Sequence, residues 1–252
     1  MAVGYAGKLP AYGDFVAGGA AAAARRAWSA WAEAGLASAR EGAERAAFAD
    51  RFLTSALWRF AVAPGVFGER MAAGVMCPSM DKVGRLFPFV ALAELDAAPP
   101  PAATLEALDG WLHATEEAVL GALEPDATLE AFEARLAAVA PPEAGGGCAP
   151  CSARAPRAVP QTLDAEGRLA AEGMDALDLE GPDEAAPDGL WITMGSGVEP
   201  PRGLAQEGPA GEALFDRLIA APPAAPRMEP PVTVVPVTTP PRTVPPFGVD
   251  HA

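Results

Sequence analysis

The sequence predicts one α/β domain, in which helices flank a central mixed sheet that contains antiparallel strands, followed by a proline-rich C-terminal tail. Segments with helical periodicity alternate with apolar runs of strand length, which is typical of this class. Two such runs, 71–77 and 86–93, are joined by a short polar loop, as antiparallel neighbours are. Ten prolines follow residue 221, and so many prolines favour an extended, solvent-exposed chain.

Two helices and a strand are the first predicted elements. Trp28 and Trp31 belong to an apolar stripe at helical spacing that predicts a helix over 26–40, and a similar stripe predicts a second helix over 44–55. Large apolar side chains alternate with other side chains over 57–62, which predicts a strand. The strand is expected to end at the pair Pro64-Gly65.

The paired runs 71–77 and 86–93 are predicted to be neighbouring strands. Pro88 lies inside the second run and lacks the backbone N–H that a ladder needs. This strand is therefore expected to lie at an edge of the sheet or to be bulged at Pro88.

A third helix is expected to start at Thr104, whose hydroxyl can cap it. Glu106 and Asp109 would then lie in its first turn, where acidic side chains are favourable. Pro125 blocks its extension, and apolar residues at helical spacing predict another helix over 129–139.

Composition divides the chain into a domain over 1–221 and a tail over 222–252. Within the domain, 141–189 has no clear periodicity and is rich in Gly, Pro, Glu and Asp, so we expect a low-complexity, partly mobile excursion. Short strands near 162–163 are an open alternative, and so is a role of the tail as a ligand for another protein. The last elements expected in the domain are a strand over 190–194 and a helix over 211–220.

Charge and composition limit the classes of partner. The formal net charge of −15 argues against nucleic acid and against anionic membranes. The longest run of small residues, 16–24, is far shorter than a membrane span, and no secretory signal pattern is present. Three cysteines without a spaced framework fit a reducing compartment. We therefore expect a cytoplasmic protein without membrane insertion.

The polar loop 78–88 and the related segment 7–15 carry most of the functional argument. Dense polar groups on a rigid scaffold usually cap a turn or meet a partner, and Arg85 can pair with a carboxylate such as Asp14 or Asp81. Phe15 is expected to anchor its segment in the core. The candidate partner-binding or loop-shaping residues are Asp14, Ser79, Asp81, Lys82 and Arg85.

An enzymatic role is the alternative, namely a small hydrolase using Asp14, Ser79, Asp81 and Lys82. Neither histidine of the chain is suitably placed in the sequence to act as a base for a serine. The Cys148/Cys151 pair lacks the further ligands of a zinc site, and no phosphate-binding loop pattern is present. No cofactor, metal or small-molecule substrate is expected.

Several short motifs occur together in an order that resembles a known family. They are Gly7-Lys8-Leu9-Pro10, Gly13-Asp14-Phe15-Val16, Trp28 and Trp31, Leu57-Trp58-Arg59-Phe60, and Pro78-Ser79-x-Asp81-x-x-Gly84-Arg85-x-Phe87-Pro88. In order and spacing they are similar to the TagF family, accessory proteins of bacterial type VI secretion. The resemblance implies one α/β domain and a non-enzymatic, post-translational repressor of secretion-system assembly. It also implies a protein partner, the forkhead-associated (Fha) scaffold protein, and opposition to activation by threonine phosphorylation.

Overall fold

A computed structural model gives the fold. It describes residues 3–96, 100–139, 150, 157–161, 187–195 and 201–219. The predicted tail, 222–252, and both cysteines of the Cys148/Cys151 pair lie outside these residues. Within the described ranges, none of the helices combines the length and the apolar character that a bilayer span requires.

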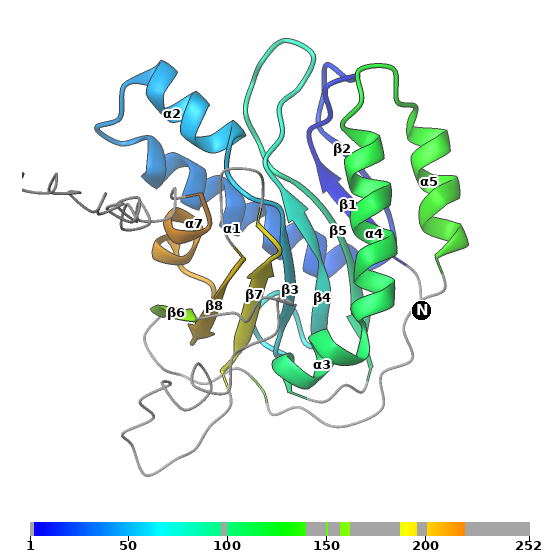
Figure 1. The fold of residues 1–252 in the computed structure, drawn as a ribbon, viewed down its shortest axis with the longest axis vertical. Helices are drawn as coiled ribbons and strands as arrows, with labels where there is room; N and C mark the ends of the chain where they lie inside the picture. Colours follow the sequence, from blue (N-terminus) through cyan, green and yellow to red (C-terminus); the bar gives the residue numbers. More distant parts are fainter. Residues whose placement is uncertain are drawn as a thin grey trace, which may run out of the picture. The chain divides into compact units, whose positions relative to one another are not determined.

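Eight strands form one sheet, in which every described pairing is antiparallel. Their spatial order is β2-β1-β5-β4-β3-β7-β8-β6 (Figure 1). The strands are β1 (Gly4–Gly7), β2 (Val16–Gly19), β3 (Trp58–Val62), β4 (Met71–Cys77), β5 (Phe89–Leu95), β6 (Arg157–Gln161), β7 (Gly189–Thr193) and β8 (Arg202–Glu207).

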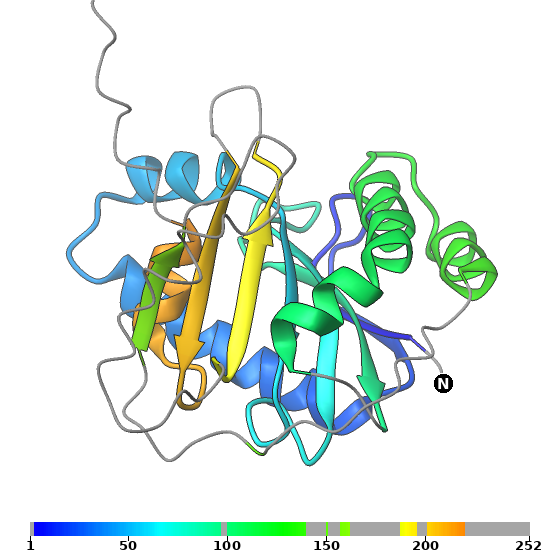
Figure 2. The ribbon, with the colours of Figure 1, turned by 60° about the horizontal axis from the view of Figure 1, so that its bottom comes forward.

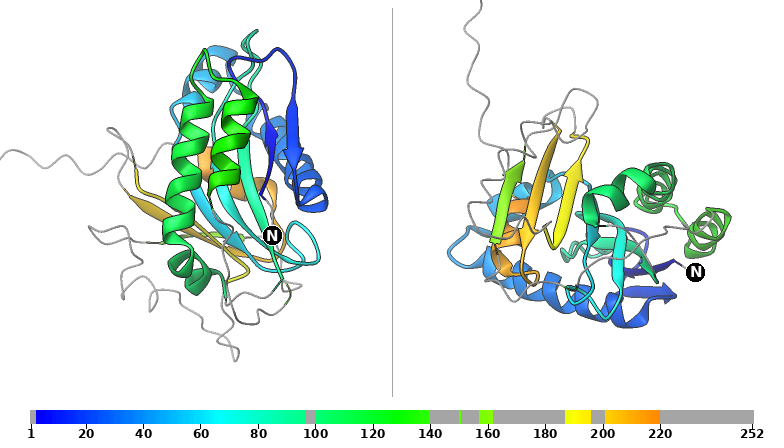
Figure 3. Two further views of the ribbon diagram at one scale, coloured as in Figure 1. Left: turned by 90° about the vertical axis from the view of Figure 1, so that its right-hand side faces the viewer. Right: turned by 90° about the horizontal axis from the view of Figure 1, so that it is seen from below.

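Helices cover both faces of this sheet. The helices α1, α2 and α7 lie on one face, and α3, α4 and α5 lie on the other (Figures 2 and 3). The bounds are α1 (Ala22–Arg40), α2 (Arg45–Leu53), α3 (Pro101–Ala107), α4 (Asp109–Ala122), α5 (Leu129–Ala138) and α7 (Glu212–Ile219). The predicted class, an α/β domain with helices flanking a central sheet that contains antiparallel strands, is confirmed. We expected a mixed sheet, with both parallel and antiparallel pairs, whereas every strand pairing that the structure describes is antiparallel.

Two apolar layers hold the helices against the sheet. On β3, Trp58, Phe60 and Val62 contact the α1 and α7 side, as their alternation predicts, while Ala61 faces the α4 side. The ring of Phe60 stacks on Trp191 of β7 with centroids 4.6 Å apart. Because both faces are covered, all seven residues of β4 are buried, and the central strands read as continuous apolar runs.

The expectation that the strand containing Pro88 lies at an edge or is bulged there is wrong. The strand β5 lies inside the sheet, between β1 and β4. It begins at Phe89, so Pro88 precedes the ladder and its missing N–H removes no rung.

The expectation that Thr104 caps a helix is also wrong. Pro101 occupies the first turn of α3, where its missing N–H costs nothing, and Thr104 lies buried inside that helix. The Thr104 hydroxyl contacts the Met71 sulfur at 3.3 Å. A break at Leu108 then separates α3 from α4, so one predicted helix is two.

Beyond 139, the structure describes one strand inside the predicted excursion. The strand β6 occupies 157–161 and pairs with β8. The strand and helix expected at 190–194 and 211–220 are present as β7 and α7, each within a residue of the predicted bounds.

Two helical glycines allow a matched test of the packing between α1 and α7. A Cβ added at Gly35 would lie 2.4 Å from the Phe215 ring, whereas one at Gly110 on α4 would meet nothing within 4 Å. We expect Gly35→Ala to lower the free energy of unfolding by about 1–3 kcal/mol, because it overpacks the core. We expect Gly110→Ala to be neutral or to stabilise by up to about 1 kcal/mol. Urea denaturation measures both, and equal effects would contradict the packing described.

Candidate functional site

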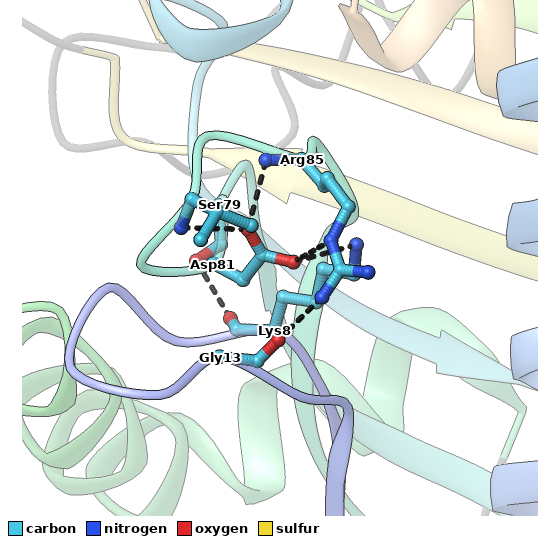
Figure 4. A network of polar contacts seen from close by, with 6 residues as sticks. Lys8, Gly13, Ser79, Asp81 and Arg85 are labelled. Atoms are coloured by element: carbon cyan, nitrogen blue, oxygen red, sulfur yellow. Dashed lines mark hydrogen bonds and ion pairs between the residues drawn. The ribbon is translucent and has the colours of Figure 1, made fainter.

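Two loops meet at one end of the sheet. One, 8–15, joins β1 to β2, and the other, 78–88, joins β4 to β5. They come together because β1 and β5 are paired neighbours, with Ala6 of β1 opposite Val90 of β5. Residues more than 70 positions apart in the sequence therefore lie side by side (Figure 4).

A buried carboxylate stands at the centre of this contact. Asp81 is only 2 % exposed. One carboxylate oxygen accepts hydrogen bonds from the backbone N–H groups of Val83 (3.1 Å) and Arg85 (2.9 Å). The other accepts from Arg85 Nε at 2.6 Å and pairs with Lys8 Nζ at 3.0 Å (Figure 4). We call the side chains of Lys8, Asp81 and Arg85 the Asp81 cluster.

The surroundings of Asp81 favour its charged form. Burial alone would raise the pKa of this carboxyl group. The Arg85 amide, the Lys8 ammonium, the Arg85 guanidinium and the Val83 amide outweigh that effect and hold the pKa well below its usual range. The group is therefore a fixed anion at neutral pH and serves as an anchor for both loops.

Further hydrogen bonds join the loops directly. The Ser79 hydroxyl donates to the Lys8 carbonyl at 2.7 Å, and the Arg85 guanidinium donates through Nη2 to the carbonyl of Gly13 (Figure 4). The Lys82 amide donates to the Tyr12 carbonyl at 2.8 Å. Polar groups buried where the loops meet thus have partners across the contact.

The turn itself depends on a glycine. Gly84 has φ of +80°, a conformation that residues with a side chain rarely adopt. Its backbone N–H donates a hydrogen bond to the Asp81 carbonyl at 2.9 Å, which closes the turn. An isolated antiparallel β-bridge pairs Met80 with Leu86, on either side of this turn. Backbone hydrogen bonds therefore fix both the turn at 81–84 and the two chain segments that lead into it.

A third element is tied to the same end of the molecule. The Tyr12 hydroxyl accepts a hydrogen bond from the Leu129 amide at 2.7 Å, in the first turn of α5. Loop 8–15 is therefore held by both loop 78–88 and the beginning of a helix.

The side chains of three of the five predicted site residues take part in the contact between the loops, and those of the other two are exposed. Ser79, Asp81 and Arg85 are brought together in the contact between the loops. The side chain of Lys82 is exposed. Asp14 is exposed and makes no hydrogen bond or ion pair with any described residue, so Arg85 pairs with Asp81 and not with Asp14.

Sequence reasoning missed Lys8 as a member of the site. A signal for it was present: the chain contains only two lysines, Lys8 and Lys82, and they fall in these two loops. The pairing of Lys8 with Asp81 depends on sheet topology, which no local motif reveals.

The expectation that Phe15 is anchored in the core is wrong. Its side chain is 45 % exposed, while its ring meets the edge of Phe87, whose ring in turn meets buried Trp28. Met80 and Val83 are 37 % and 70 % exposed. Three of the six exposed large hydrophobic residues among those described thus lie on these two loops, which marks the loops as a candidate interaction surface.

The geometry gives no support to a hydrolase. Ser79 is buried and its hydroxyl donates to a backbone carbonyl, so it is not placed as a nucleophile. The cavity between α4 and α5, of about 230 Å³, and the small one beside Trp58 are lined by neither Asp14, Ser79, Asp81 nor Lys82. Within the described ranges, no group of three His, Cys, Asp or Glu side chains is arranged to hold a metal ion.

Replacement of the central carboxylate tests its structural role. Asp81→Asn keeps the shape but removes the charge that Lys8 and Arg85 share. We expect it to lower the free energy of unfolding by about 2–4 kcal/mol, because the mostly buried Lys8 ammonium loses its partner charge and the amide that replaces the carboxylate cannot accept from all four donors. Asp14→Asn, an exposed carboxylate in the same loops, should change stability by less than about 0.5 kcal/mol. Equal losses in urea denaturation would contradict the assignment.

The lowered pKa of Asp81 predicts that the stability of the protein depends on pH. Because folding lowers the pKa of Asp81, its stabilising contribution is present above the unfolded pKa of about 3.9 and is lost as the pH falls below that value. The stability difference between wild type and Asp81→Asn should therefore shrink between about pH 5 and pH 2. Denaturation at several pH values measures it, and a constant difference would show that the Asp81 charge is not stabilised by folding.

Comparisons with known proteins agree with this fold and these loops. The family model for the TagF N-terminal domain, Type VI secretion system-associated, matches residues 4–139, which include both loops. The fold is also similar to the crystal structure of PA0076 from Pseudomonas aeruginosa PAO1, with a TM-score of 0.64. The two sequences are 32 % identical, and the match covers 90 % of this chain and 98 % of that chain. No curated protein matches significantly. The resemblance seen in the sequence is confirmed, and the chain belongs to the TagF family of type VI secretion system-associated proteins.

Proposed function

We propose that this protein is a non-enzymatic, post-translational repressor of type VI secretion system assembly. It acts in the cytoplasm by binding a forkhead-associated scaffold protein. Membership of a type VI secretion-associated family supports the setting.

One observation carries the proposal for a binding role. Loops 8–15 and 78–88 are locked together by the buried Asp81 cluster and expose Phe15, Met80 and Val83. Interfaces gain affinity when apolar side chains are held in place before binding, because less conformational freedom is lost. A catalytic site would instead need a concave pocket with a nucleophile or a general base, whereas the buried Ser79 hydroxyl donates to a backbone carbonyl and the two cavities described above are lined by none of the candidate polar residues.

The exposed apolar residues provide the test. We expect the double variant Phe15→Ser/Val83→Ser to bind the purified scaffold protein of the same secretion system at least tenfold more weakly than wild type, since interface energy is concentrated in a few apolar anchors. Leu120→Ser on α4, where the side chain is 47 % exposed and so comparable with Phe15, is the control away from the loops and should bind normally. Isothermal titration calorimetry measures the affinities, and thermal unfolding checks that each variant is folded.

A secretion assay in the native host tests the sign of the effect. Raising the level of the wild-type protein should reduce secretion, and the Phe15→Ser/Val83→Ser variant should have less effect at equal abundance. Unchanged secretion with the wild-type protein would contradict the role as a repressor. Absence of scaffold binding would contradict the partner.

A further inference from the structure

The sign of the charge on the two loops differs from that of the whole chain. The protein carries a formal net charge of −15. The two loops contain three cations, Lys8, Lys82 and Arg85, and two carboxylates, Asp14 and Asp81, so their formal sum is 3 − 2 = +1. The surface that the loops offer is therefore more positive than the rest of the protein.

The cations that remain available lie at the tip of loop 78–88. The charge of Asp81 is already engaged by Lys8 and Arg85 inside the cluster. The side chain of Lys82 is exposed and has no ion pair within the described ranges. A second loop carboxylate, Asp14, is also exposed and does not neutralise Lys82 through an ion pair.

The guanidinium of Arg85 has an edge left over. Arginine has five N–H donors, of which Nε is used by Asp81 and one on Nη2 by the Gly13 carbonyl. The remaining donors, on Nη1 and Nη2, form the edge that matches a carboxylate in a paired hydrogen bond. The side chain is 58 % exposed, and its inner contacts fix its orientation.

Apolar side chains accompany these cations. Val83 follows Lys82 directly in the turn, and Phe15 lies two residues beyond Gly13, to which Arg85 is bonded. A partner segment that suits this surface offers carboxylates and an apolar side chain close together.

We propose that loops 8–15 and 78–88 bind an acidic segment of the partner protein. A carboxylate of that segment pairs with Lys82 and the outer edge of Arg85, and an adjacent apolar side chain packs on Val83 and Phe15. This inference rests on the proposed function, because it names the chemistry that the scaffold protein must present to the same surface.

Charge reversal at Lys82 tests the inference without disturbing the Asp81 cluster. We expect Lys82→Glu to weaken binding of the intact scaffold protein at least tenfold, whereas Lys82→Arg should stay within about threefold of wild type. Arg45→Glu, at an exposed arginine of α2, is the matched control for the change in net charge. Wild-type affinity should fall between 50 and 300 mM NaCl, and Lys82→Gln should reduce that salt dependence.

Zero-length crosslinking adds a positional readout. A carbodiimide joins a lysine amine to a carboxylate, and the only other lysine, Lys8, is 15 % exposed and paired inside the cluster. We expect mass spectrometry of the crosslinked complex to find Lys82 joined to an aspartate or glutamate of the scaffold protein. The crosslink should be lost in Lys82→Arg, which retains the charge and the binding.

The outcomes separate the two proposals. If the wild-type protein binds the scaffold protein but Lys82→Glu binds equally well, or Lys82 crosslinks to no scaffold carboxylate, the acidic-segment inference is overturned and the proposed function stands. If the wild-type protein does not bind the scaffold protein at all, the proposed partner is wrong and the inference falls with it.

Discussion

The Asp81 carboxylate is removed from water, and an anion in that position must have its oxygens satisfied by the protein. Two backbone amides, a guanidinium and an ammonium meet that requirement, and they come from both connecting loops. The complete cluster therefore requires the ends of β1 and β5 to be correctly paired. In this way the order of the sheet determines the shape of the surface that the loops present.

The sequence predicts the parts of the fold whose side chains show a strong period. Trp58, Phe60 and Val62 alternate visibly, so β3 can be placed from its residues alone. The strands β1 and β2 cannot be placed in this way, because glycines replace the side chains that would mark the alternation. A Cβ on Gly18 of β2 would lie 2.3 Å from the hydroxyl of Tyr5, so the pairing of β1 with β2 requires a glycine there. The same glycine removes the side chain by which the strand could be recognised in the sequence.

The site is predictable to a similar, limited extent. The local pattern within 78–88 identifies Ser79, Asp81 and Arg85, because a turn residue and its ion pair are only four positions apart. Lys8 and the carbonyl of Gly13 belong to another connection, and only the pairing of β1 with β5 brings them near. The exposure of Phe15 is equally non-local, since it depends on Phe87 occupying the inner position against Trp28.

The strand order has a consequence for synthesis of the chain on the ribosome. The inner strand β3 pairs with β4 on one side and with β7 on the other, and β7 lies more than 120 residues further along the chain. Until β7 has been translated, the nascent protein carries an unpaired, apolar edge at β3, a surface that favours aggregation. The half of the chain that contains the loop site therefore emerges first, but β3 can gain its second partner only after residue 193 has been translated.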